Sequence, residues 1–294
     1  MNYKDSIPNW LYDYLGISIP NEGDEIDLSG QNFIFNKGIL RNQLLLSNTQ
    51  AQTEETFGFK WEKRNTFDSE ASLARVKSWL IERYGDVLKS DWLNEHGENP
   101  IIIDAGCGAG MSALELFGHH LSKTRYLGID VSSSVDVAAT RFAERKTPGA
   151  FMQVDVSNPP FPPNSVDMIF SEGVLHHTDS TKESLLTLAR LLKKGGHFMF
   201  YVYNRKGPLR EFTDDHIRDQ LQPLAPQEAW EAIEPLTQLG ITLGELNTEV
   251  DVPQSIDLLG IPAGKISIQR LFYWHIAKAF YDPNLTLEEM NHIN

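Results

Sequence analysis

The sequence of 294 residues contains little cysteine and comparatively few basic side chains. Its one cysteine, Cys107, excludes an intramolecular disulfide and any zinc site held by several cysteines. Against 40 Asp and Glu there are only 26 Lys and Arg, which gives a net charge of −14. The chain therefore lacks the excess of basic residues that usually accompanies binding to nucleic acid or to an anionic membrane.

Long apolar runs are also missing. No segment approaches the ~20 apolar residues of a membrane-spanning helix, and no apolar stretch typical of a secretion signal follows Met1. We therefore expect a cytoplasmic protein with a small-molecule substrate and with neither a membrane nor a nucleic-acid partner. The oligomeric state is open, and a homodimer is one candidate.

The most informative stretch is 101–110, which reads Ile-Ile-Ile-Asp-Ala-Gly-Cys-Gly-Ala-Gly. The β-branched run predicts a buried parallel strand, and the three alternating glycines predict a tight loop after it. Apolar residues at helical spacing in 111–117 predict a helix after the loop. Glycines in this position let a ligand lie against the backbone, because they bring no Cβ.

Two further acids follow predicted strands. Strand 126–130 ends in Asp130, where a carboxylate can accept both ribose hydroxyls of a bound nucleoside. A third strand, within 151–156, carries Asp155 near its end. Predicted strands at 166–170 and 198–203 continue the alternation with helices, which indicates an α/β protein.

These segments resemble the motifs of the class I S-adenosylmethionine (SAM)-dependent methyltransferases. The motifs are Asp-x-Gly-x-Gly-x-Gly at 104–110, Asp130, Asp155, Val-Leu-His-His at 174–177 and Lys-Gly-Gly at 194–196. The resemblance implies a Rossmann-like α/β sheet, with SAM as cofactor and S-adenosylhomocysteine as product. A nicotinamide-dependent reductase is the weakest rival, because Met111 replaces the last glycine of the dinucleotide motif and such enzymes need no acid at 155.

The resemblance also implies a cofactor site. Asp104 would lie near the methionine moiety, Asp130 would bind the ribose and Asp155 the adenine amino group. The predicted cofactor-binding residues are Asp104, Gly106, Cys107, Gly108, Gly110, Asp130, Val131, Asp155, Val156, Glu172 and Trp61. Trp61 belongs to an aromatic segment, at 57–61, that precedes the domain in a subset of the family. Its alternating aromatics predict an extended segment that either covers a sulfonium or packs on the core.

Candidate catalytic residues lie in the loop after the fourth strand. His176 or His177 is the predicted base, and the alternative is that their rings only pack or position the loop. Tyr203, Arg205 and Arg210 follow the fifth strand and are predicted to contact substrate, although a solvated helix start explains the arginines equally well. We expect no metal, because two adjacent histidines are not a specific ligand pattern.

Three regions are predicted. Residues 1–55 form an N-terminal extension, which we interpret as a metal-free remnant of a zinc ribbon, and 56–204 form the SAM-binding core. Residues 205–294 form a helical segment on the substrate side that acts as a lid, with helices at 205–221, 226–239 and 269–281.

The account of the last region has an alternative, in which 241–246 and 265–268 form the strand pair that closes a minimal domain. We favour a helical insertion after strand five, as in larger members of the family. On that interpretation the chain stops before its closing strands, or they are supplied otherwise.

The predicted function is methyl transfer from SAM to a small molecule, with O-methylation favoured over N- or C-methylation. Two alternatives stay open. One is methylation of a peptide or protein side chain, and the other is a SAM-binding partner or regulatory subunit without turnover.

Overall fold

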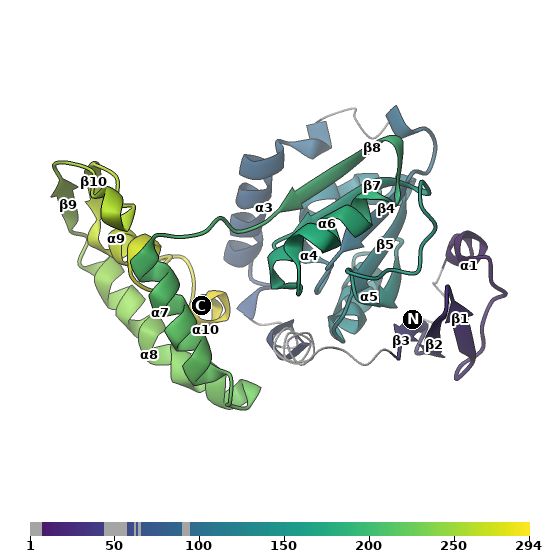
Figure 1. Ribbon diagram of the computed structural model, residues 1–294, viewed down its shortest axis with the longest axis horizontal. Helices are drawn as coiled ribbons and strands as arrows, with labels where there is room; N and C mark the ends of the chain where they lie inside the picture. Colours follow the sequence, from purple (N-terminus) through teal and green to yellow (C-terminus); the bar gives the residue numbers. More distant parts are fainter. Residues whose placement is uncertain (1–7, 44–57, 62, 64–65, 90–94) are drawn as a thin grey trace. The chain divides into compact units, whose positions relative to one another are not determined.

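The computed structural model describes residues 8–43, 58–61, 63, 66–89 and 95–294 (Figure 1). The chain divides into two compact units. The first combines residues 1–62 with 75–203, and the second combines 63–74 with 204–294. Each unit is described by itself below.

The first unit is built on a mostly parallel sheet with helices on both faces. Its five central strands are β4 (Ile101–Ala105), β5 (Arg125–Asp130), β6 (Ala150–Gln153), β7 (Val166–Glu172) and β8 (Leu192–Tyr201). They are all parallel and lie in the order β6-β5-β4-β7-β8. The order reverses at β4, and open α/β sheets bind ligands at the carboxyl ends of the strands beside such a reversal. The predicted Rossmann-like α/β fold is confirmed.

The alternation of side chains along β4 divides the core in two. Ile101, Ile103 and Ala105 belong to one apolar cluster, whereas Ile102 belongs to the other. Successive side chains of a strand point to opposite faces, so a fully buried strand needs both faces covered. The helices of this unit include α4 (Met111–Phe117), α5 (Ser134–Glu144) and α6 (Thr181–Ala189), and α3 (Glu70–Tyr84) belongs to it from Arg75 onward. Short 3-10 turns are η3 (Val87–Lys89), η5 (Gly118–Lys123) and η6 (Leu175–His177).

The N-terminal residues extend this sheet. After α1 (Trp10–Leu15), the antiparallel strands β1 (Glu25–Leu28), β2 (Gln31–Asn36) and β3 (Ile39–Asn42) follow, and β3 pairs in parallel with β6. The sheet therefore has eight strands. The descent of this extension from a zinc ribbon stays a prediction.

The segment around Trp61 differs from the expectation. Residues 58–61 are helical rather than extended, and Phe57 lies outside the described residues. The physical reason is an ambiguity of spacing, because residues 57 and 61 alternate along a strand but also share one face of a helix.

The second unit is mainly helical. It contains α7 (Pro208–Leu221), α8 (Pro226–Glu245), α9 (Ile268–His275) and α10 (Leu287–Ile293), with the antiparallel pair β9 (Glu249–Val252) and β10 (Gly264–Ser267) and the turn η7 (Asp257–Leu259). Within the described residues, no helix is long and apolar enough to cross a membrane.

The alternative of a closing strand pair and the end of one predicted helix are wrong for this unit. Residues 241–246 do not form a closing strand, because α8 extends to Glu245 and its Gly244 packs against the ring of Tyr281. β10 pairs with β9 in a separate sheet, so none of the described residues after β8 adds a strand to the eight-stranded sheet. The helix expected at 269–281 ends at His275, where the chain turns back and the Gln269 side chain binds the Ala279 carbonyl at 2.8 Å.

Candidate active site

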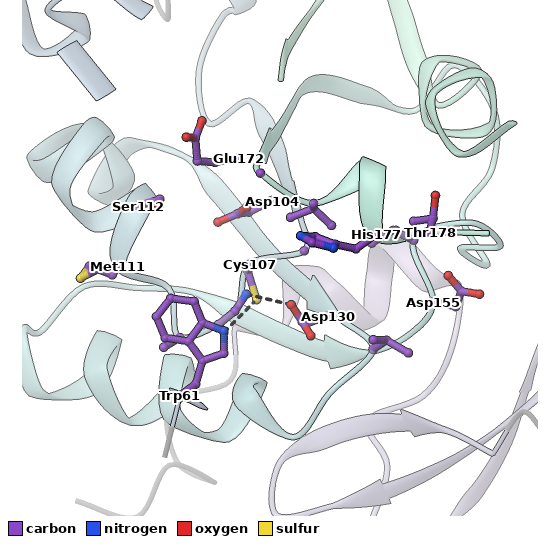
Figure 2. A pocket seen from close by; sticks show the side chains of 17 residues that line it. Trp61, Asp104, Cys107, Met111, Ser112, Asp130, Asp155, Glu172, His177 and Thr178 are labelled. Atoms are coloured by element: carbon purple, nitrogen blue, oxygen red, sulfur yellow. Dashed lines mark hydrogen bonds between the residues drawn. The ribbon is translucent and has the colours of Figure 1, made fainter. Parts of the chain in front are cut away.

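A cavity of about 120 Å³ opens at the carboxyl edge of the parallel strands (Figure 2). Every predicted cofactor-binding residue except Gly110 lines it. The lining residues are Trp61, Asp104, Gly106, Cys107, Gly108, Ala109, Met111, Ser112, Asp130, Val131, Asp155, Val156, Glu172, Gly173, Val174, His177 and Thr178. Residues from β4, β5, β7 and the loop after β6 thus meet in one place, as parallel strands with a common carboxyl edge require.

The glycine loop is fastened to β5. The amides of Gly106 and Cys107 both donate to the Ile129 carbonyl, at 2.7 and 2.9 Å. Gly106 has a φ of +81°, and a Cβ there would lie 2.3 Å from Cγ1 of Val174. Only glycine satisfies both constraints.

Gly110 supports the loop from the other side. It adopts a φ of +74° before α4, and a Cβ there would lie 2.9 Å from the Phe142 ring. Its bare Cα therefore faces the core rather than the cavity, which explains its absence from the lining. The buried Arg141 donates to the Ala109 carbonyl at 2.7 Å and ties the loop to α5.

Asp130 is held by backbone amides. Its Oδ2 accepts from the Gly108 amide at 2.9 Å, and its Oδ1 accepts from the amide and hydroxyl of Ser132 at 2.9 and 2.7 Å. An ionised carboxylate has about four acceptor positions. The loop uses three of them, so about one is left for a ligand.

Asp104 is the buried acid of the cavity. The Tyr126 hydroxyl donates to Oδ2 of Asp104 at 2.7 Å, and Asp104 is only 2% exposed. Burial raises the pKa of Asp104 to about 7, against the lowering effect of the Tyr126 hydrogen bond, and the charges of Asp130 and Glu172 raise it further. A cationic group placed beside Asp104 would relieve this cost.

Glu172 is anchored by the last turn of α3. The Tyr84 hydroxyl donates to its Oε2 at 2.5 Å, and the Arg83 guanidinium pairs with its Oε1. Burial raises the pKa of Glu172, while Tyr84 and Arg83 act in the opposite direction. Neither partner was predicted from the sequence, because both lie almost ninety residues before Glu172 and match no motif.

Asp155 and Trp61 complete the cofactor side. The Ser157 amide donates to Oδ1 of Asp155 at 2.8 Å, which fixes the loop after β6. Trp61 lies over the glycine loop, with its Nε1 3.0 Å from the position of a Cβ on Gly108 (Figure 2). Gly108 therefore leaves the space that the indole occupies.

The two histidines have different surroundings. His177 lines the cavity, whereas His176 does not. The His176 ring packs in a tilted orientation against His177 and Tyr203, with centroid distances of 4.1 and 4.0 Å. Among the described residues neither of its ring nitrogens has a hydrogen-bond partner, and burial lowers its pKa to about 4. His176 is therefore a neutral, packed imidazole at neutral pH.

The three residues predicted to contact substrate do not belong to the same unit. Tyr203 belongs to the first unit and stacks on His176, whereas Arg205 and Arg210 belong to the second. The buried Arg210 pairs with Asp214 at 2.7 Å and donates to the Tyr273 carbonyl. These contacts give Arg210 a packing function within its own unit, and Arg205 is exposed.

No metal centre is evident in the part of the chain that the structure describes. Within it, no group of three or more His, Cys, Asp or Glu side chains could hold a metal ion.

Residues 103–200 match a family model described as "Methyltransferase domain". The uncharacterized methyltransferase YcgJ of Bacillus subtilis is 26% identical over 172 residues, which are 56% of this chain and 67% of YcgJ. The tRNA U34 carboxymethyltransferase of Shewanella frigidimarina is 31% identical over 38% of this chain and 36% of its own length. The crystal structure of YcgJ has a TM-score of 0.36, covering 61% of this chain and 70% of the YcgJ chain at 20% identity.

Coverage of the relatives is uneven. Beyond YcgJ, two uncharacterized relatives from Synechococcus and Arabidopsis are matched over 26% and 34% of their length. The chain thus spans about a third of these relatives. The matched region contains β4 through most of β8, together with the glycine loop and the three acids that follow their strands. The chain therefore contains a class I S-adenosylmethionine-dependent methyltransferase domain, and S-adenosylmethionine is its cofactor.

Proposed function

We propose that this chain transfers a methyl group from SAM to a small molecule, with an oxygen acceptor favoured. One observation carries the proposal. Asp104 on β4, Asp130 at the end of β5 and Asp155 after β6 meet the glycine loop at a single cavity. Dinucleotide-binding sites need the first two features but not an acid in the position of Asp155.

The donor set fits SAM. Asp104 is a buried carboxylate without a cationic partner among the described residues, and it suits the ammonium and sulfonium charges of the methionine moiety. Asp130 retains about one acceptor position for a ribose hydroxyl. Asp155 would accept from the adenine amino group, and the face of Trp61 suits a sulfonium.

Bound SAM supplies an electrophilic methyl carbon for an in-line displacement. The chain then has to orient the two reactants and to remove the proton of the acceptor. His177 lies at the cavity and can accept that proton through a ring nitrogen. His176 holds the neighbouring ring by stacking at 4.1 Å, so we assign it a positioning function.

The alternatives have different support. A SAM-binding subunit without turnover shares the whole cofactor side of the cavity, and a peptide acceptor is compatible with the acidic composition. The similarity to a protein named tRNA U34 carboxymethyltransferase makes tRNA a further candidate. A net charge of −14 opposes tRNA, because phosphate binding depends on Lys and Arg.

Calorimetric titration of the purified chain with SAM, and separately with NAD, tests the cofactor assignment. We expect micromolar binding of SAM and none of NAD. Incubation with SAM radiolabelled in its methyl group and with the small-molecule, peptide and tRNA fractions of a cell extract then separates the acceptors. Label in the small-molecule fraction supports the proposal, and binding without any labelled product supports the subunit without turnover.

The two histidines can be separated by turnover. His177→Ala should lower kcat at least a hundredfold, because a positioned base contributes about 10²–10⁴ in rate, while the SAM Kd stays within twofold. His119→Ala removes a histidine outside the cavity and is the matched control. Unchanged turnover of His177→Ala would limit His177 to a structural function.

A further inference from the structure

A row of rings in tilted and edge-on contact begins at the cavity within the first unit. His177, which lines the cavity, packs on His176 with ring centroids 4.1 Å apart, and His176 packs on Tyr203 at 4.0 Å. Tyr203 then contacts Tyr201 edge-on at 5.7 Å. The guanidinium of Arg83 lies 3.8 Å from the centroid of the Tyr201 ring and closes the row.

The row is fixed at Arg83, whereas Tyr203 in its middle is accessible. Arg83 is held by its ion pair with Glu172, so Tyr201 rests on an anchored group. Tyr203 is 52% exposed although both of its neighbours in the row are packed against it. A half-exposed tyrosine adds little to the core, so stability alone does not account for its place.

The rings of His176 and Tyr203 are also uncharged at neutral pH. Burial lowers the pKa of His176 to about 4, so its ring is neutral at neutral pH. Its ring nitrogens have no hydrogen-bond partner among the described residues. His176 therefore packs as a neutral ring between the other two, and Tyr203 presents a flat, exposed π face 6.3 Å from the ring of His177, which lines the cofactor cavity. Planar rings stack on such faces, whereas a saturated ring of the same size makes fewer close contacts with them.

We propose that His177, His176 and Tyr203 form the acceptor platform of the enzyme and that the acceptor is a flat aromatic compound with a ring hydroxyl. The proposal rests on the proposed methyl transfer and adds the substrate class to it. His177 belongs to both the platform and the cavity, and its ring lies 6.3 Å from that of Tyr203, so a flat compound packed on Tyr203 can direct its hydroxyl to the His177 ring.

The transfer step balances without a further reactant. The phenolic oxygen forms the new bond to the methyl carbon, and the bond from that carbon to sulfur breaks. The sulfur keeps the bonding electron pair, which yields S-adenosylhomocysteine, and the phenolic proton passes to the His177 imidazole. A phenol loses its proton far more readily than an aliphatic alcohol, so a single histidine base suffices.

The test compares two bicyclic alcohols of matched size in the presence of saturating S-adenosylhomocysteine, which prevents turnover. 2-Naphthol is flat, and decahydro-2-naphthol is its saturated counterpart. Calorimetry should show that 2-naphthol binds at least tenfold more tightly. Tyr203→Leu should weaken 2-naphthol binding at least tenfold and abolish the preference, while Tyr203→Phe keeps both.

Phe212→Leu is the matched control, because it removes an aromatic side chain that is 72% exposed on α7 of the second unit. It should leave the preference unchanged. The proposal is overturned if the two alcohols bind equally, if neither binds, or if the Leu and Phe variants of Tyr203 behave alike. Failure of S-adenosylhomocysteine itself to bind would instead contradict the proposed function, so the two failures are distinguishable.

Discussion

The two halves of the cavity are built by different means. On the β4, β5 and β6 side, the glycine loop and the acids are fixed by local backbone hydrogen bonds, such as those from Gly108 and Ser132 to Asp130. On the β7 and β8 side, Glu172 and the histidines are fixed by side chains that arrive from distant elements, including Tyr84 of α3 and Tyr203 after β8.

This difference has a functional reason. The cofactor is common to the whole family, so its half can be encoded in short motifs whose backbone geometry is local. The acceptor differs among enzymes, and its half depends on side chains that packing brings together. We therefore expect changes on the β4–β6 side to affect cofactor binding strongly, and changes at the long-range contacts of Glu172 to affect it less.

The largest effect should come from Gly106→Ala. A Cβ there would approach Val174 to 2.3 Å at a φ of +81°. The clash and the left-handed backbone together should cost about 2–5 kcal/mol of unfolding free energy and abolish measurable SAM binding. Gly85→Ala is the matched control, since it has a similar φ of +78° but open space around the new Cβ. Urea unfolding should show a loss of only about 1–2 kcal/mol of unfolding free energy for the control. Equal losses for the two variants would mean that the Val174 side chain moves aside at little cost.

Asp130→Ala should have the next largest effect. Loss of its charge-assisted hydrogen bond to the ribose should weaken SAM binding by about 2 kcal/mol, or about thirtyfold in Kd. Asp136→Ala removes an acid that pairs with Arg41 and does not line the cavity, so its Kd should equal that of the unmodified chain. Calorimetry measures both, and an unchanged Kd for Asp130→Ala would remove this residue from the ribose site.

The pH dependence of SAM binding should be intermediate in size. Because the pKa of Asp104 is raised to about 7, the carboxylate that would pair with SAM is mostly protonated below that pH. Affinity should therefore be about tenfold lower at pH 6 than at pH 8. The same raised pKa means that Asp104 contributes less to stability as the pH rises from about 4 to 7. Asp104→Asn should bind SAM weakly at all pH values, and a persisting pH dependence in that variant would assign the titration to another group.

Tyr84→Phe should have the smallest effect. It removes the hydroxyl that donates to Glu172 but keeps the ring that packs edge-on against Phe170. We expect a loss of about 1 kcal/mol in SAM binding, or about fivefold, because the Arg83 pair still holds the carboxylate. Tyr14→Phe is the control, as its hydroxyl contacts Ser165 away from the cavity. A thirtyfold loss of SAM affinity for Tyr84→Phe would mean that both halves of the cavity contribute equally to cofactor binding.

Much of the first unit could be predicted from the sequence. The sequence shows the motifs in order: the strand with Ile101–Ile103, the glycine loop, and the acids at 104, 130 and 155. The parallel sheet brings these motifs to one edge. These features are local, because a β-branched run needs a buried strand and alternating glycines need a loop. The sequence alone therefore determined the Rossmann-like sheet and the residues that line the cofactor side.

The tertiary structure decided the rest. Spacing could not distinguish a strand from a helix at 58–61, nor show that Gly244 lets α8 continue against Tyr281. The separation of His177 at the cavity from His176 beneath Tyr203 depends on how η6 packs against the end of β8. The support of Glu172 by Arg83 and Tyr84 is likewise invisible in the sequence, because nothing local relates the end of α3 to the end of β7. Neighbouring residues determine the local backbone geometry, whereas contacts between side chains far apart in the sequence form only in the packed fold.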